Sequence, residues 1–191
     1  MSRTIRTGLP ALFVLALAPS TLLAQEEMAF ESPEQAKLIE EATSAAPASI
    51  AAAATIMDLE GNVLREGTNR WTCLPDMPDD DNYEPMCNDA EWMKFIHAFM
   101  NGTEPEVTGL GVSYMLSSHW AVSNIDPTAT EPTPDNEWVE GGAHLMVIVP
   151  DPALLEGYPD DPGPGPYVMW KGTPYEHLMV PMEDVVEKGG N

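Results

Sequence analysis

Two copies of a His-x-Met pair are the residues of this 191-residue chain best suited to chemistry. His144 and Met146 form the first pair, and His177 and Met179 form the second. Residues two apart in a β-strand project to the same face, so each pair would share a face of its strand. Imidazole and thioether groups are ligands that suit copper, especially Cu(I). If the two strands are neighbours, the four side chains form a candidate copper site.

A structural role explains the same residues equally well. Methionine is a flexible filler of irregular cores, and a histidine at the start of a strand can bond a backbone carbonyl. Residues 143–147 and 176–180 match at four positions in register, which indicates two strands with the same local role. The sequence alone leaves copper binding and core packing both open.

Acidic residues gather in two proline-rich segments and suggest a second kind of site. They are Asp76, Asp79, Asp80, Asp81, Glu84, Asp160 and Asp161. Calcium takes six to eight oxygen ligands, many of them from carboxylates, but the spacing of an EF-hand loop is absent here. A run of acids in a loop is more commonly a solvated surface. A calcium-stabilised domain is therefore an alternative rather than a conclusion.

No catalytic motif stands out in the chain. Ser117 and Ser118 precede His119, but adjacency in sequence does not make a catalytic triad. The sequence has no Gly-x-Ser-x-Gly, no His-Glu-x-x-His and no glycine-rich phosphate loop. His97 falls on a predicted helix, where a surface or partly packed position is expected. These observations favour a binding or structural protein over an enzyme.

Aromatic residues in or beside the late loops offer a third possibility, a recognition surface. They are Trp120, Trp138, Tyr158, Tyr167, Trp170 and Tyr175. Aromatic side chains on loops contribute strongly to binding surfaces, yet they can equally hold those loops in place by packing. The sequence does not separate these two roles.

Two helices are expected to position these groups. Ser32 is a suitable N-cap, Pro33 suits the first helical position and Gln35 completes a capping box, so a helix is predicted from there to about Ala45. A second helix is predicted between a cap at Asn88 and a stop at Asn101-Gly102. Its apolar face has helical spacing and consists of Trp92, Phe95, Ile96 and Phe99.

The rest of the chain favours short strands and long loops. The alanine run 51–54 is interpreted as leading into a strand at 55–57, and Gly61-Asn62 is a hairpin turn into 63–65. Further strands are predicted at 111–116, 144–149, 167–170 and 177–180, and the unbroken apolar run 144–149 indicates a central strand covered on both faces. Loops are expected at 123–138 and 151–166, with three and five prolines. The predicted fold is a single α+β domain with an antiparallel or mixed sheet, two main helices and long proline-rich loops.

The N-terminus has the layout of a secretory signal. Arg3 and Arg6 precede a short apolar stretch that ends in a small residue at Ala24, so residues 1–24 are predicted to be removed and 25–191 to form the exported domain. No apolar segment reaches the roughly 20 residues that span a bilayer. The remaining six Lys and Arg stand against 31 Asp and Glu, a formal charge of −25, which disfavours nucleic acid and favours cations or basic partners. We expect a soluble periplasmic or secreted protein, and the sequence does not indicate its oligomeric state.

The only two cysteines, Cys73 and Cys87, are predicted to form a disulfide. An exported protein enters an oxidising compartment, and the spacing suits a bond that closes a short loop. Such a bond contributes about 3 kcal/mol in the chain-entropy model. A pair of free thiols that binds a soft metal is the alternative.

Several stretches resemble a group of small exported bacterial proteins to which no activity is assigned. The likeness rests on Trp71-Thr72-Cys73, Met86-Cys87, His144-Leu145-Met146 and the run from Tyr167 to Tyr175, within residues 55–182. It implies a shared fold and transfers no catalytic residue. Gly142-Ala143-His144 departs from the pattern, which would have a proline before the histidine.

Overall fold

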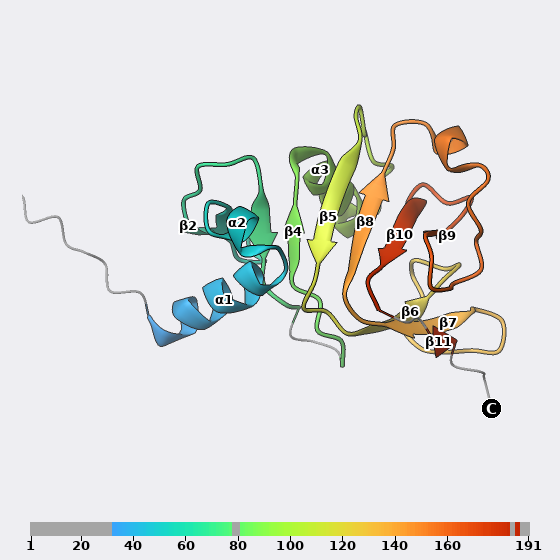
Figure 1. Cartoon of the computed structure of the whole chain (residues 1–191), viewed down its shortest axis with the longest axis horizontal. Helices are drawn as coiled ribbons and strands as arrows, with labels where there is room; N and C mark the ends of the chain where they lie inside the picture. Colours follow the sequence, from blue (N-terminus) through green and yellow to red (C-terminus); the bar gives the residue numbers. More distant parts are fainter. Residues whose placement is uncertain (1–31, 78–80, 184–185, 188–191) are drawn as a thin grey trace, which may run out of the picture. The chain divides into compact units, whose positions relative to one another are not determined.

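The computed structural model describes residues 32–77, 81–183 and 186–187, which form one α+β domain (Figure 1). The predicted signal peptide at residues 1–24 lies outside the described residues. The helices are α1 (Pro33–Ser44), the one-turn α2 (Ala48–Ala51), α3 (Ala90–Asn101) and the 3-10 helix η1 (Pro152–Leu155). None of the helices in the described part of the chain is long and apolar enough to cross a membrane.

Helix α1 forms where the sequence predicted it. The Ser32 hydroxyl accepts a hydrogen bond from the Gln35 amide at 3.1 Å, and Pro33 occupies the first turn. The Gln35 side chain does not close the capping box as predicted, because its amide donates to the Leu64 carbonyl at 3.1 Å. That bond ties the first turn of α1 to the edge of the sheet.

Most of the strands form one mixed sheet of eight, in the order β2-β1-β3-β4-β5-β8-β10-β9. Its strands are β1 (Thr55–Met57), β2 (Val63–Arg65), β3 (Thr72–Leu74), β4 (Met86–Asn88), β5 (Gly111–Met115), β8 (His144–Ile148), β9 (Tyr167–Met169) and β10 (His177–Pro181). Strands β1 and β3 are parallel, whereas the other neighbours within the described residues are antiparallel. The predicted α+β class and mixed sheet are confirmed.

A second, small sheet consists of β6 (Trp120–Ser123), β7 (Trp138–Gly141) and β11 (Val186–Glu187), in the order β11-β7-β6. The sequence predicted the proline-rich loop between β6 and β7 but not these strands. They are short, and their pairing depends on contacts between distant segments rather than on a local alternation of apolar residues.

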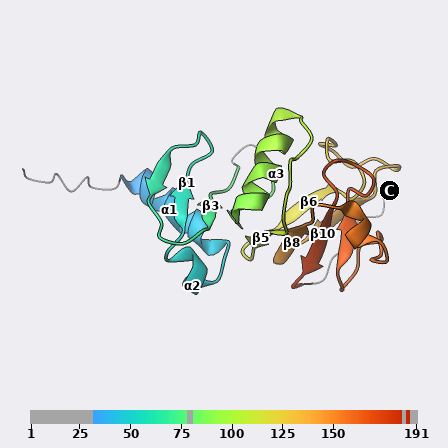
Figure 2. The same ribbon diagram turned by 90° about the horizontal axis from the view of Figure 1, so that it is seen from above.

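Helix α3 lies across one face of the large sheet, over β5 and β8 (Figure 2). Asp89 caps it, with the carboxylate accepting from the amides of Glu91 and Trp92 at 3.1 and 2.9 Å, so the predicted cap at Asn88 is wrong by one residue. Asn88 instead ends β4. Gly102 closes the helix in the left-handed conformation at φ 62°, as the Asn101-Gly102 pair predicted. The predicted apolar face is buried at Trp92 and Phe95.

The opposite face of the sheet is covered near β8 and β10. Leu155 of η1 packs there with Val168 and Leu178, and Val147 and Val149 are partly buried against this cluster. Strand β8 is therefore covered on both faces, as its unbroken apolar run predicted.

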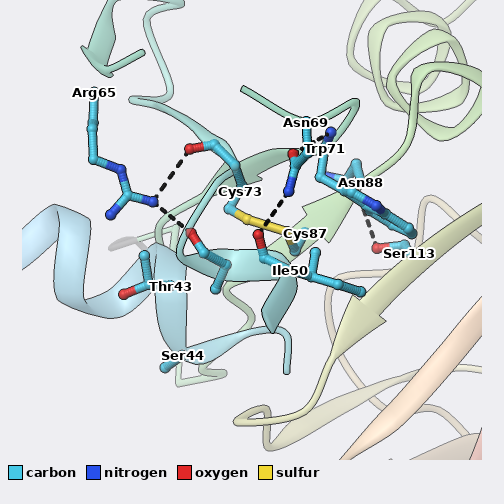
Figure 3. Close-up of a disulfide and its surroundings, with 12 residues drawn as sticks. Thr43, Ser44, Ile50, Arg65, Asn69, Trp71, Cys73, Cys87, Asn88 and Ser113 are labelled. Atoms are coloured by element: carbon cyan, nitrogen blue, oxygen red, sulfur yellow. Dashed lines mark hydrogen bonds between the residues drawn. A yellow bond between two sulfur atoms is a disulfide. The ribbon is translucent and has the colours of Figure 1, made fainter. Parts of the chain in front are cut away.

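Close to α1, the disulfide is part of the hydrophobic core (Figure 3). Cys73 and Cys87 are bonded and directly opposite each other on β3 and β4, with Cα atoms 3.9 Å apart, so the predicted disulfide is confirmed. Both are fully buried in a cluster of small residues from α1 and α2, which lets the helices approach the strands. Arg65 donates to the carbonyls of Ala51 and Ala54 in this region.

The predicted strand at residues 55–57 is confirmed as β1, but the alanine run 51–54 that precedes it is not extended. Ala51 ends α2, and a turn follows before β1 begins at Thr55. Alanine has the highest intrinsic helix propensity, and the Arg65 guanidinium donates to the carbonyl of Ala51 at the end of this helix. Local propensity therefore decides the conformation of the first part of the run.

Candidate functional site

The two His-x-Met pairs lie on adjacent antiparallel strands, β8 and β10. Met146 is directly opposite Met179, and His144 is opposite Pro181. Because alternate residues of a strand face the same way, all four side chains project to the sheet face that α3 covers. Each of the four is at most 9% exposed. The structure thus gathers on one buried face the residues that the sequence singled out.

The two histidines stand at opposite ends of the methionine pair. The register of β10 on β8 puts His177 level with Ile148, four residues along β8 from His144. Four residues of strand span about 13 Å, whereas a nitrogen ligand lies about 2 Å from its metal ion. A single ion on this face would therefore be held by Met146, Met179 and one of the histidines.

Each histidine also has a methionine directly opposite on its other neighbouring strand. Met115 of β5 is opposite His144, and Met169 of β9 is opposite His177. Sequence reasoning missed both methionines as site residues. The alternation of residues in β5 could have placed Met115 on the same face as Ser113, but only the strand order puts it beside His144.

A backbone carbonyl two residues upstream fixes each imidazole ring. His144 Nδ1 lies 2.8 Å from the Gly142 carbonyl oxygen, and His177 Nδ1 lies 2.9 Å from that of Tyr175. A carbonyl can only accept, so Nδ1 of His177 carries the hydrogen and Nε2 carries the free lone pair. Nδ1 of His144 also faces a donor, the Trp120 indole N–H at 3.1 Å, so the Gly142 carbonyl alone does not assign the tautomer of this ring. This common arrangement agrees with the expectation that the two similar segments have the same local role.

Both rings are neutral at neutral pH. Burial lowers the pKa of His144 to about 4, while the bond to Gly142 opposes this effect. Burial also lowers the pKa of His177 to about 4, while the bond to Tyr175 opposes this effect and a smaller electrostatic effect of His144 adds to it. Both rings are therefore uncharged, and His177 presents Nε2 as an acceptor or metal ligand.

The face under α3 borders a pocket of about 480 Å³. Its walls come from α3, from strands β5, β8, β9 and β10, and from the segments around Met57 and Asp126. Nine of the twelve methionines of the chain line it, namely Met57, Met77, Met86, Met93, Met100, Met115, Met146, Met169 and Met179. The methionines are therefore concentrated around one cavity rather than spread through the core.

His177 is enclosed by aromatic rings at one end of this pocket. The ring centroids of Trp92, Phe95 and Trp170 lie 5.6, 5.8 and 5.0 Å from that of His177, all close to perpendicular. Nε2 of His177 is buried and has no hydrogen-bond partner in the described part of the chain. Sequence reasoning placed Trp92 and Phe95 on the apolar face of a helix but had no signal that they would surround His177.

Comparison with known proteins leaves the role of this pocket open. No protein-family model, curated protein or solved structure matches the chain.

The acidic residues do not assemble into a metal cluster in the described part of the chain. No three His, Cys, Asp or Glu side chains converge there to hold an ion. Asp79 and Asp80 lie outside the described residues. The carboxylate of Asp76 accepts from the Glu84 amide at 2.7 Å and so shapes its loop, while Asp160 pairs with Lys171 at 2.8 Å. Asp161 borders a separate polar pocket of about 270 Å³.

The seryl and histidyl groups near residue 118 do not form a nucleophile and base. The Ser118 hydroxyl lies 3.3 Å from His144 Nδ1, but it donates to backbone carbonyls, those of Met115 at 2.8 Å and Gly142 at 3.0 Å. A general base would have to accept the hydrogen of the serine hydroxyl itself. His119 is exposed and stacks on Tyr83 instead.

The aromatic residues of the late loops mainly hold these loops in place. Trp120 and Tyr167 are buried, and Trp138 is half-buried. The Trp170 indole donates to the Ser123 carbonyl at 2.8 Å, and the Tyr175 hydroxyl donates to that of Thr103 at 3.1 Å. Tyr158 is the exception, with 43% of its surface exposed.

Proposed function

We propose that this is an exported binding protein that takes a small, mainly apolar molecule into the pocket between α3 and the large sheet. One observation carries the proposal: His177 lines that pocket, and its buried Nε2 has no hydrogen-bond partner among the described residues. A buried polar atom without a hydrogen bond costs roughly 1–3 kcal/mol. A bound molecule that supplies the missing donor would recover this energy.

The size and lining of the pocket support a small organic ligand. Pockets for such ligands measure roughly 300–1,000 Å³ and combine an apolar wall with a few polar groups. The volume of about 480 Å³ falls in this range. Methionine side chains are flexible and polarisable, so a wall made largely of methionine adapts to ligands of different shape.

The proposal is tested with the environment-sensitive dye N-phenyl-1-naphthylamine. We expect its fluorescence to rise on binding to the folded domain. A tryptophan in place of Met93, on the α3 wall of the pocket, should fill space and abolish this rise. Leu110→Trp is the matched control, because Leu110 is 61% exposed and does not line the pocket. Equal dye binding by both variants would contradict the proposal.

A second candidate function is the binding of Cu(I). The observation that favours it is the direct opposition of Met146 and Met179, with His177 two residues from Met179 on the same face. Two thioethers and a neutral imidazole make a ligand set suited to Cu(I). The proposed ion would take Nε2 of His177, whose hydrogen is on the other ring nitrogen.

Silver is a convenient probe for this second candidate, because Ag(I) shares the preference for soft ligands and does not change oxidation state in air. We expect one equivalent of Ag(I) to bind in competition with a thioether chelator. His177→Phe should abolish tight uptake, whereas His119→Phe, at an exposed ring that does not line the pocket, should not. Uptake that is unchanged in His177→Phe would exclude this site.

We further propose that the mature domain acts in the periplasm or outside the cell, where its net charge favours cations or basic partners over nucleic acid. The N-terminal layout and the buried disulfide are consistent with export. Cell fractionation followed by intact-mass measurement tests this. The proposal requires a chain that begins near Gln25 in the exported fraction, and a full-length chain retained in the cytoplasm would refute it.

A further inference from the structure

We infer that the pocket selects a neutral, ring-containing molecule with a hydroxyl group, which donates a hydrogen bond to Nε2 of His177. This inference rests on the proposed function and specifies the ligand of the same pocket. Three features of the pocket lead to it: the fixed tautomer of His177, the charges of the lining, and the rings around the imidazole.

The first feature is the direction of the hydrogen bond. Tyr175 provides only a carbonyl oxygen at 2.9 Å from Nδ1, so the ring hydrogen is committed to that side. Nε2 is then an acceptor that has no donor among the described residues. A ligand group that meets it must carry a hydrogen, which an ether or a ketone lacks.

The second feature is charge. Among the described residues, no lysine or arginine belongs to the pocket lining, whereas Asp58, Glu84 and Asp126 do. A carboxylate or phosphate on the ligand would have no cation to pair with there and would be repelled by the strongly acidic chain. The neutral imidazole also offers no positive charge. The lining therefore disfavours anionic ligands.

The third feature is the aromatic surroundings of His177. Trp92, Phe95 and Trp170 place their rings within 5.8 Å of the imidazole, and Trp120 also lines the pocket. Rings packed edge to face gain roughly 0.5–1.5 kcal/mol beyond the burial of their surface. A ligand with an aromatic ring gains from these contacts while its hydroxyl group reaches Nε2.

The experiment compares 1-naphthol with 1-methoxynaphthalene, which has the same ring but no hydrogen to donate. Binding is followed by quenching of tryptophan fluorescence, since three tryptophans line the pocket. We expect naphthol to bind on the order of tenfold more tightly, because its hydroxyl group satisfies a buried acceptor. The advantage should disappear in His177→Phe and persist in His119→Gln, because His119 is exposed and does not line the pocket.

A second measurement does not depend on a substituted protein. In the wild-type chain labelled with ¹⁵N-histidine, naphthol should shift the Nε2 resonance of His177, while methoxynaphthalene should leave it in place. Equal affinity for both compounds, with no such shift, would overturn this inference and leave the proposed function intact. Binding of neither compound would count against the proposed function itself. Stronger binding of 1-naphthylmethylammonium than of naphthol would also overturn the inference, in favour of a cationic ligand.

Discussion

Met146 and Met179 are directly opposed on β8 and β10, on the sheet face that also carries the buried rings of His144 and His177. This relationship separates the two candidate functions. An apolar ligand needs the shape and the apolar surface of the two side chains, whereas a soft metal ion needs their sulfur atoms. A substitution that keeps the first property and removes the second distinguishes them.

The first prediction concerns the double variant Met146→Leu, Met179→Leu. Leucine has nearly the volume of methionine, so the domain should lose less than about 3 kcal/mol of unfolding free energy for the two changes together. Binding of 1-naphthol should stay within about threefold of the wild type, while Ag(I) affinity should fall by at least about tenfold if the metal uses these sulfurs. Isothermal titration calorimetry with 1-naphthol and with Ag(I) measures the two affinities.

Met182→Leu is the control for this pair. Met182 is 54% exposed and does not line the pocket, so the same chemical change there should alter neither binding property. Ag(I) binding that survives in the double variant would rule out the methionine pair as its ligand. Loss of naphthol binding together with a normal melting temperature would show that the sulfurs matter to the organic ligand as well.

The second prediction follows from the two buried histidines. Their pKa values are lowered to about 4 in the folded protein, against about 6.5 in an unfolded chain. Between these values the unfolded chain binds more protons than the folded one, so stability decreases as the pH falls from about 6.5 towards 4. Above about pH 6.5 both histidines are neutral in the folded and in the unfolded chain, so the folded protein keeps its full stability. The free energy of unfolding that the two histidines cost it at lower pH amounts to a few kcal/mol.

Urea unfolding at pH 7 and pH 5 tests this prediction. The loss of stability between the two values should be smaller in His144→Gln and in His177→Gln than in the wild type. His119→Gln, at an exposed ring, should behave like the wild type. The many carboxylates titrate in every variant, so the comparison isolates the histidines. If the wild type and the three variants lost the same stability between pH 7 and pH 5, the prediction would be wrong.

The third prediction concerns the Cys73–Cys87 disulfide, which joins directly opposed residues of β3 and β4 in the cluster beside α1. Its sequence separation of 14 residues corresponds to about 3 kcal/mol in the chain-entropy model. A reducing agent should lower the urea midpoint of the wild type and leave that of Cys73→Ala, Cys87→Ala unchanged. An unaffected wild-type midpoint, with reduction verified by mass, would show that packing of the alanine-rich cluster suffices.

Local signals predicted those parts of the fold that local physics decides. Ser32 and Pro33 begin α1, Gly102 ends α3, and the apolar run of β8 is covered on both faces. The disulfide followed from the small number and close spacing of the cysteines. In each case the residues that determine the structure lie within about one turn or strand of each other, so the sequence is informative.

The candidate site could be predicted only in part, because its assembly depends on the order of the strands. The repeated His-x-Met pattern identified four buried residues of one face. It did not show that β5 and β9 add Met115 and Met169, or that α3 brings Trp92 to His177. These contacts join segments that are distant in the chain, and a single sequence has no periodicity that encodes them. The short strands β6 and β7 were missed for the same reason.

The last prediction concerns Gly111, where α3 approaches the sheet. A Cβ atom built on Gly111 would lie 2.7 Å from Cγ1 of Ile148 and 2.9 Å from Cβ of Glu91 on the first turn of α3. Gly111→Ala should therefore push the helix away from β5 and cost roughly 1–3 kcal/mol of unfolding free energy.

Because α3 forms one wall of the pocket, Gly111→Ala should also weaken naphthol binding by several-fold, through a change in the spacing of Trp92 and Phe95 from His177. Gly163→Ala is the matched control, since nothing lies within 4 Å of a Cβ atom built there. Urea unfolding and fluorescence titration measure the two effects. If Gly111→Ala matched Gly163→Ala in stability and in affinity for naphthol, α3 and Ile148 would have adjusted without moving the pocket wall. The close approach at Gly111 would then have no part in shaping the site.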